Sequence, residues 1–183
     1  MKIGLFYATG THKTASVARK IQQEFGENIA DIIPIENASP KDFEAYSHII
    51  AGSSTWFDGE LPSYWDEILP ELSTLDLSKK KVAIFGLGDQ KGYPDNFADG
   101  IGILANEFLS RGAILTGETS PEGYTFNQSQ ALRNGKFLGL VLDIENQPKQ
   151  TDERIKGWVK QLKEEFKEEF KENKTGPEDS FIC

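Results

Sequence analysis

Short apolar runs alternate with longer helical patterns along this chain, and no other feature constrains the fold as much. Six runs are typical of strands, namely Ile3–Tyr7, Ile29–Ile35, His48–Gly52, Lys81–Gly86, Ala113–Gly117 and Phe137–Leu142. Four further segments have helical periodicity, namely Thr14–Phe25, Pro62–Leu72, Asn96–Arg111 and Asp152–Phe170. Several strands are apolar at consecutive positions, as expected where helices cover both faces of a parallel sheet. The sequence therefore predicts an α/β fold with a doubly wound sheet.

Size and charge limit the domain count and the partners. The chain has 183 residues, of which 38% are hydrophobic, so we expect one domain at 1–171 and a disordered tail at 172–183. The net charge of −9 repels phosphate backbones, which argues against nucleic acid and anionic membranes as partners. A basic protein is the expected partner.

The one cysteine, Cys183, allows neither an internal disulfide nor a cysteine metal site. No apolar run approaches the roughly 20 residues that span a bilayer. A strand pattern follows Met1 directly, so we expect no secretory signal and a reducing, soluble compartment.

Two segments interrupt the alternation. Glu118–Lys136 has no clear period and is long for a connection, which indicates a functional insertion or a surface meander. Near the C-terminus the tetrapeptide Lys-Glu-Glu-Phe occurs twice, at Lys163–Phe166 and Lys167–Phe170. We expect the first copy to pack on the sheet and the second to extend beyond it.

Ligands of open α/β sheets bind at the carboxyl ends of the strands, so the loops after strands one, three and four are candidates. The first contains Thr9, Gly10, Thr11, His12, Lys13 and Thr14 and leads into a helix. Hydroxyls and N–H groups at a helix start favour an anion site, although a plain helix cap is the alternative.

The other two loops carry aromatic residues. Trp56 and Phe57 follow strand three and suit a flat ligand, unless Trp56 folds back onto the domain. Tyr93 follows strand four and is either a ligand contact or an ordinary turn aromatic. Three such loops at one edge predict a shared site.

These segments together resemble the flavodoxins, in particular their long-chain branch, over about residues 2–170. The similar segments include Ile3–Tyr7, Ser54-Thr55-Trp56, Phe85–Gln90, Gly92–Phe97 and Leu132–Phe137. The resemblance implies strand order 2-1-3-4-5, with Glu118–Lys136 as an insertion that splits the fifth strand. It also implies non-covalently bound FMN, whose place at the switch point of the sheet is a property of the family.

The resemblance implies a role for each candidate residue. Thr9 to Thr14 would hold the FMN phosphate, and Trp56 and Tyr93 would flank the isoalloxazine ring. Thr55, Phe57, Asp58 and Gly59 would line the ring edge, and Gly88, Asp89 and Asn96 its pyrimidine side. Ser54 and Leu87 complete the predicted set, which contains no catalytic residue and no metal ligand.

The implied function is a low-potential one-electron carrier that shuttles mainly between semiquinone and hydroquinone. The Phe57–Asp58 carbonyl would accept the N5–H of the flavin, and the negative charge of the protein would oppose the second reduction. The chain departs from the family pattern at two places. His12 replaces a common glycine and is either strained or turned outward. Phe57-Asp58 stands where small or apolar residues are common, and Asp58 brings a negative charge near the ring.

Other readings remain open. One is an FMN-dependent quinone or flavin reductase, which would need room for a nicotinamide beside the ring. Another is a protein-binding module that keeps the fold but binds no FMN. The acidic residues Asp58, Glu60, Asp89 and Asp95 would steer basic surfaces of a reductase or acceptor, or are merely solvated. We expect a monomer in the cytoplasm, or in the plastid stroma of an alga.

Overall fold

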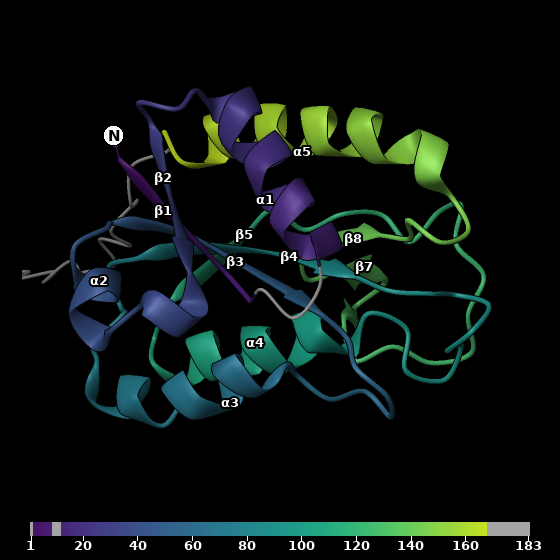
Figure 1. The fold of residues 1–183 in the computed structure, drawn as a ribbon, viewed down its shortest axis with the longest axis horizontal. Coiled ribbons are helices and arrows are strands. Elements are labelled where there is room, and N and C mark those ends of the chain that lie inside the picture. Colours follow the sequence, from purple (N-terminus) through teal and green to yellow (C-terminus); the bar gives the residue numbers. More distant parts are fainter. Residues whose placement is uncertain (1, 9–11, 168–183) are drawn as a thin grey trace, which may run out of the picture.

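The computed structural model describes residues 2–8 and 12–167, which form a parallel sheet between two layers of helices (Figure 1). Its strands are β1 (Ile3–Tyr7), β2 (Ala30–Pro34), β3 (His48–Ser54), β4 (Lys81–Leu87), β5 (Ile114–Thr116) and β8 (Leu140–Leu142). They lie in the order β2-β1-β3-β4-β5, and β8 also pairs with β4. The predicted fold class and strand order are therefore confirmed.

The fifth position of the sheet is shared by two short strands. β5 pairs with Lys81–Ala83, the first half of β4, and β8 pairs with Phe85–Leu87, the second half. The insertion leaves the sheet after β5 and returns at β8. It contains a hairpin of β6 (Leu132–Arg133) and β7 (Lys136–Phe137), joined by a turn in which Asn134 and Gly135 have positive φ.

The single strand predicted at Phe137–Leu142 is wrong, because the hairpin ends at Phe137 and the sheet resumes at Leu140. Gly139 lies at the junction, where an added Cβ would approach the Ile84 carbonyl oxygen to 2.1 Å. A glycine allows this close passage of two backbones.

Helices cover both faces of the sheet (Figure 1). α1 (His12–Phe25) and α5 (Thr151–Glu165) cover one face, and α3 (Ser63–Ile68) and α4 (Asp99–Ser110) cover the other. Alternate strand residues pack into the two layers, with Leu5 on the α1 side and Phe6 on the α4 side. Short helical turns complete the chain, namely η1 (Ile35–Asn37), α2 (Pro40–Glu44), η2 (Glu71–Thr74) and η3 (Pro148–Gln150).

Several helices differ from the sequence prediction. The helix expected at Pro62–Leu72 is divided into α3 and η2, because Pro70 has no N–H for the helical hydrogen bond. The helix expected from Asn96 begins at Asp99, since Ala98 has a φ of 54° and cannot continue a right-handed turn. α2 was not predicted, although Ser39 and Asp42 form its capping box.

α5 ends earlier than expected, at Glu165. Phe166 of the first Lys-Glu-Glu-Phe copy is buried, and its ring stacks on Phe25 at 6.3 Å. The second copy after Lys167, the predicted domain end at residue 171, the predicted tail and Cys183 lie outside the described residues. Within the described ranges, no helix has the length and apolar character that a membrane span requires.

Candidate functional site

A cavity of about 260 Å³ opens at the carboxyl edge of the sheet, where the connections from β1 and β3 diverge. The residues around it come from the start of α1 and from the ends of β3, β4 and β8. They are Lys13, Ser54, Thr55, Leu87, Gly88, Asp89, Tyr93, Asn96 and Glu145. This is the place in a doubly wound sheet where ligands bind.

A closed turn follows β3 beside this cavity. The backbone N–H groups of Trp56 and Glu60 each donate to the other residue's carbonyl at 2.8 Å. Within the turn Phe57 has a φ of 36° and Gly59 a φ of 92°. A left-handed backbone costs a non-glycine residue about 1–2 kcal/mol, so the turn stores strain at Phe57. The Phe57 side chain is 70% exposed.

The turn is fastened to the loop after β4. The Asn96 Nδ2 donates to the Asp58 carbonyl oxygen at 3.2 Å and to Asp99 Oδ2 at 3.3 Å. A Cβ on Gly59 would lie 2.7 Å from that Asp99 oxygen. Thr55 provides a further link, because its Oγ1 accepts the Gly100 N–H at 3.0 Å. Two of the three predicted loops are therefore held as one unit.

Asp89 is a fixed carboxylate in the wall of the cavity. Its Oδ1 accepts the N–H groups of Lys91 at 3.1 Å and Gly92 at 2.8 Å, and the Asn146 Nδ2 at 2.8 Å. The Gly92 N–H is the main cause that lowers the pKa of Asp89 below its usual value. Asp89 therefore stays negative while it holds the loop that presents Tyr93.

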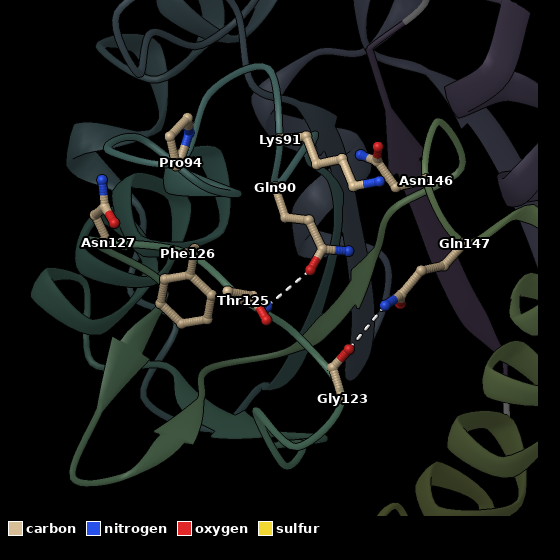
Figure 2. Close-up of a pocket in the computed structure, with 9 residues that line it drawn as sticks. All are labelled: Gln90, Lys91, Pro94, Gly123, Thr125, Phe126, Asn127, Asn146 and Gln147. Atoms are coloured by element: carbon tan, nitrogen blue, oxygen red, sulfur yellow. Dashed lines mark hydrogen bonds between the residues drawn. The ribbon is translucent and has the colours of Figure 1, made fainter.

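The insertion supports the same loop from its other side. The N–H groups of Asn127 and Gln128 donate to the Pro94 carbonyl oxygen at 2.8 and 3.0 Å. Figure 2 shows the Thr125 N–H directed at the Gln90 side chain, with a distance of 2.7 Å to Oε1, across a second hollow of about 450 Å³. Tyr93, 53% exposed, is therefore presented by a loop that is anchored on both flanks.

The start of α1 forms the remaining side of the cavity. Lys13 Nζ makes an ion pair with Glu145 Oε1, and Thr14 is buried. His12 is exposed and is the first residue of α1, which favours the outward orientation over the strained one. The strained backbone beside the cavity is that of Phe57. Thr9, Gly10 and Thr11 lie outside the described residues.

Two consecutive serines at the end of β3 differ in their hydrogen bonding. Ser53 Oγ donates to the Ser54 carbonyl oxygen at 2.8 Å. Ser54 Oγ is buried and has no hydrogen-bond partner among the described residues. An unpaired buried hydroxyl costs about 1–3 kcal/mol.

Apart from His12 and Thr14 at the start of α1, the predicted residues that the structure describes fall into two groups. Lys13, Ser54, Thr55, Leu87, Gly88, Asp89, Tyr93 and Asn96 line the cavity. Trp56, Phe57, Asp58 and Gly59 form the neighbouring turn. Glu145 was missed because the strand-end rule was applied to strands one, three and four, and not to the strand that precedes it.

Comparison with known proteins gives a consistent result. The flavodoxin family model matches residues 5–158. A flavodoxin of a Nostoc species is 51% identical over 165 residues, which cover 90% of this chain and 97% of that protein. A Haemophilus influenzae flavodoxin is 41% identical over 165 residues, which cover 90% and 95%.

Solved structures support the same family as the sequence relatives do. The Fusobacterium nucleatum flavodoxin bound to flavin mononucleotide is 33% identical with a TM-score of 0.85, and the match covers 90% of this chain and 98% of that one. Family model, sequence relatives and fold thus point the same way, and this chain belongs to the flavodoxin family.

Proposed function

We propose that this protein is a low-potential electron carrier whose redox group is a non-covalently bound FMN. The observation that carries the proposal is the cavity at the switch point, lined by Tyr93 and by Thr55, which leads into the turn that contains Trp56. Membership of the flavodoxin family supports it, as does the FMN bound by the relative from Fusobacterium nucleatum.

The residues present fit the chemical parts of FMN. α1 begins at His12 with no acidic side chain in its first turn, so its N–H groups and Lys13 suit a phosphate. Trp56 and Tyr93 offer aromatic faces for the ring. Gly88, Asp89 and Asn96 lie at the cavity wall, where backbone and amide groups suit the polar edge of a flavin. Thr9 to Thr11 complete the proposed phosphate loop.

When bound, FMN supplies the ability to take up and release electrons one at a time. The chain supplies a hydrogen-bond acceptor that can hold a proton in place at flavin N5. Within the described residues no group donates to the Phe57 carbonyl, whereas the Trp56 carbonyl accepts two N–H groups and the Asp58 carbonyl accepts that of Asn96. We assign the Phe57 carbonyl oxygen as the acceptor of a hydrogen bond from the N–H group at flavin N5.

The charge of the chain favours a low potential. Asp89 is held ionised in the cavity wall, and the whole chain carries a net charge of −9. Like charges repel most strongly where water is excluded. Placing further negative charge in this cavity is therefore unfavourable, which lowers the potential of the last electron that the bound group accepts.

The full-length protein tests this function. Purified protein is expected to be yellow, to release FMN on denaturation, and to titrate in two well-separated one-electron steps followed by absorbance. It is expected to oxidise NADPH only when a reductase is added. Protein that neither contains nor takes up FMN would refute the proposal, and rapid NADPH oxidation by the protein alone would favour a flavin or quinone reductase.

We also propose that the carrier is a cytoplasmic monomer that docks on basic surfaces of redox proteins. Asp58, Glu60 and Asp95 are exposed at the mouth of the site. Asp89 is also charged at this edge of the sheet, but it is only partly exposed, so we expect it to contribute less to docking than these three carboxylates. Size-exclusion chromatography with light scattering tests the monomer, and fractionation of the source cells tests the compartment.

The docking proposal predicts a dependence on salt. Reduction of a basic probe, cytochrome c, by the reduced protein is expected to slow at least about 5-fold as the ionic strength rises from 0.01 to 0.15 M, because screening shortens the range of attraction. Asp58→Asn should weaken this dependence. Asp76→Asn, which removes an exposed charge just before β4 at the opposite edge of the sheet, is the control. A rate that is indifferent to salt would contradict the proposal.

A further inference from the structure

The hydroxyl of Ser54 is a buried polar group without a hydrogen-bond partner among the described residues. Ser54 is 8% exposed, its Oγ has no partner among the described residues, and the residue lines the cavity. Its neighbour Ser53 is also buried, yet Ser53 Oγ donates to a carbonyl within the chain. The two serines therefore differ in whether the protein itself satisfies them.

Apart from the exposed Tyr93, the other polar side chains around the cavity already have partners. Lys13 is paired with Glu145, Thr55 Oγ1 accepts the Gly100 N–H, and Asn96 donates to the Asp58 carbonyl. Ser54 stands apart from them because its hydroxyl is buried and unpaired. Unpaired buried polar groups are rare in native proteins, and binding sites are among the places that retain them.

The position of Ser54 indicates which part of a ligand it meets. β3 lies between β1, whose loop leads to the start of α1, and β4, whose loop presents Tyr93. Ser54 is the last residue of β3 and is paired with Leu87, the last residue of β4. A ligand with its phosphate at α1 and its ring beside Tyr93 must cross the end of β3 in between.

We propose that the Ser54 hydroxyl is a hydrogen-bond partner of the ribityl chain of FMN. The inference rests on the proposed function, since the ribityl chain is the polyol that joins the phosphate of FMN to its ring. The serine side chain can turn about its Cα–Cβ bond between three staggered positions, so Oγ, which is buried in the present rotamer, can swing to meet a polyol oxygen in the cavity. The unpaired group lowers the stability of the protein without cofactor and increases its affinity for cofactor.

Ser54→Ala tests this with two effects of opposite sign. Without cofactor the variant is expected to be more stable than the wild type, by about 2–4 °C in Tm, because the unpaired hydroxyl is gone. The Kd for FMN, and that for riboflavin, should rise about 3- to 10-fold. Lumiflavin, which has the ring but no ribityl chain, should bind both proteins equally, as measured by the quenching of tryptophan fluorescence.

Ser53→Ala is the matched control. It removes a hydroxyl that is bonded within the chain, so it should lower Tm and leave the ratio of FMN to lumiflavin affinity unchanged. The inference is overturned if Ser54→Ala binds FMN as tightly as the wild type, or if it loses the same factor for lumiflavin. A wild-type protein that fails to bind FMN would refute the proposed function itself, which separates the two failures.

Discussion

Tyr93→Ala is expected to weaken FMN binding by about 10- to 100-fold. The tyrosine side chain is 53% exposed in a loop that Asp89 and the insertion hold in place, so its face is available to a ring without rearrangement. Burying an aromatic side chain contributes about 1.5–3 kcal/mol, and each 1.4 kcal/mol changes Kd tenfold. Titration of the cofactor-free protein with FMN, followed by flavin fluorescence, measures the change.

Two variants sharpen this prediction. Tyr93→Phe keeps the ring and should bind FMN within about 3-fold of the wild type, because stacking does not need the hydroxyl. Tyr64→Ala removes another exposed tyrosine, which lies on α3 outside the cavity, and should leave Kd unchanged. Equal losses in Tyr93→Ala and Tyr64→Ala would mean that Tyr93 does not face the cofactor.

The position of the site was predictable because it follows from the direction of the strands. In a parallel sheet the carboxyl ends of β1, β3 and β4 share one edge, so Lys13, Ser54 and Tyr93 come together whatever the details of their loops. Apolar runs located those strands to within a few residues. Eight of the nine residues that line the cavity were in the predicted set, most of them named individually by the resemblance to the family.

The features of the site that could not be predicted from the sequence depend on tertiary contacts. The positive φ of Phe57 has no local signal, because the turn is closed by Trp56 and Glu60 and fastened by Asn96 from a distant loop. Glu145 follows a strand that exists only because the insertion returns beside β4. The hairpin β6–β7 could have been predicted, since Asn134-Gly135 is a strong signal for a tight turn.

Gly102→Ala is expected to lower the Tm by about 3–10 °C. Gly102 lies in α4 where the insertion crosses the helix, and an added Cβ would approach the Gln130 carbonyl oxygen to 2.2 Å. The obstacle is backbone and cannot swing aside, so the insertion must move away from α4. Overpacking of this kind costs about 1–3 kcal/mol, and 1 kcal/mol shifts the Tm of a chain of this size by about 2–4 °C.

Gly157→Ala is the matched control and should change Tm in the opposite direction. Gly157 also lies within a helix, α5, but nothing in the structure lies within 4 Å of an added Cβ. Alanine is favoured over glycine in a helix by about 0.8–1.0 kcal/mol, which should raise the Tm by about 2–4 °C. Thermal unfolding of the two cofactor-free variants gives the comparison.

Gly102→Ala should also affect cofactor binding. The insertion that it displaces holds the Pro94 carbonyl, and with it the loop that presents Tyr93. We expect its FMN affinity to fall, while Gly157→Ala binds FMN as the wild type does. If both variants changed Tm in the same direction, close passage of the insertion over α4 would not be the cause. If Gly102→Ala lost stability but kept its FMN affinity, the insertion would stabilise the fold without positioning the site.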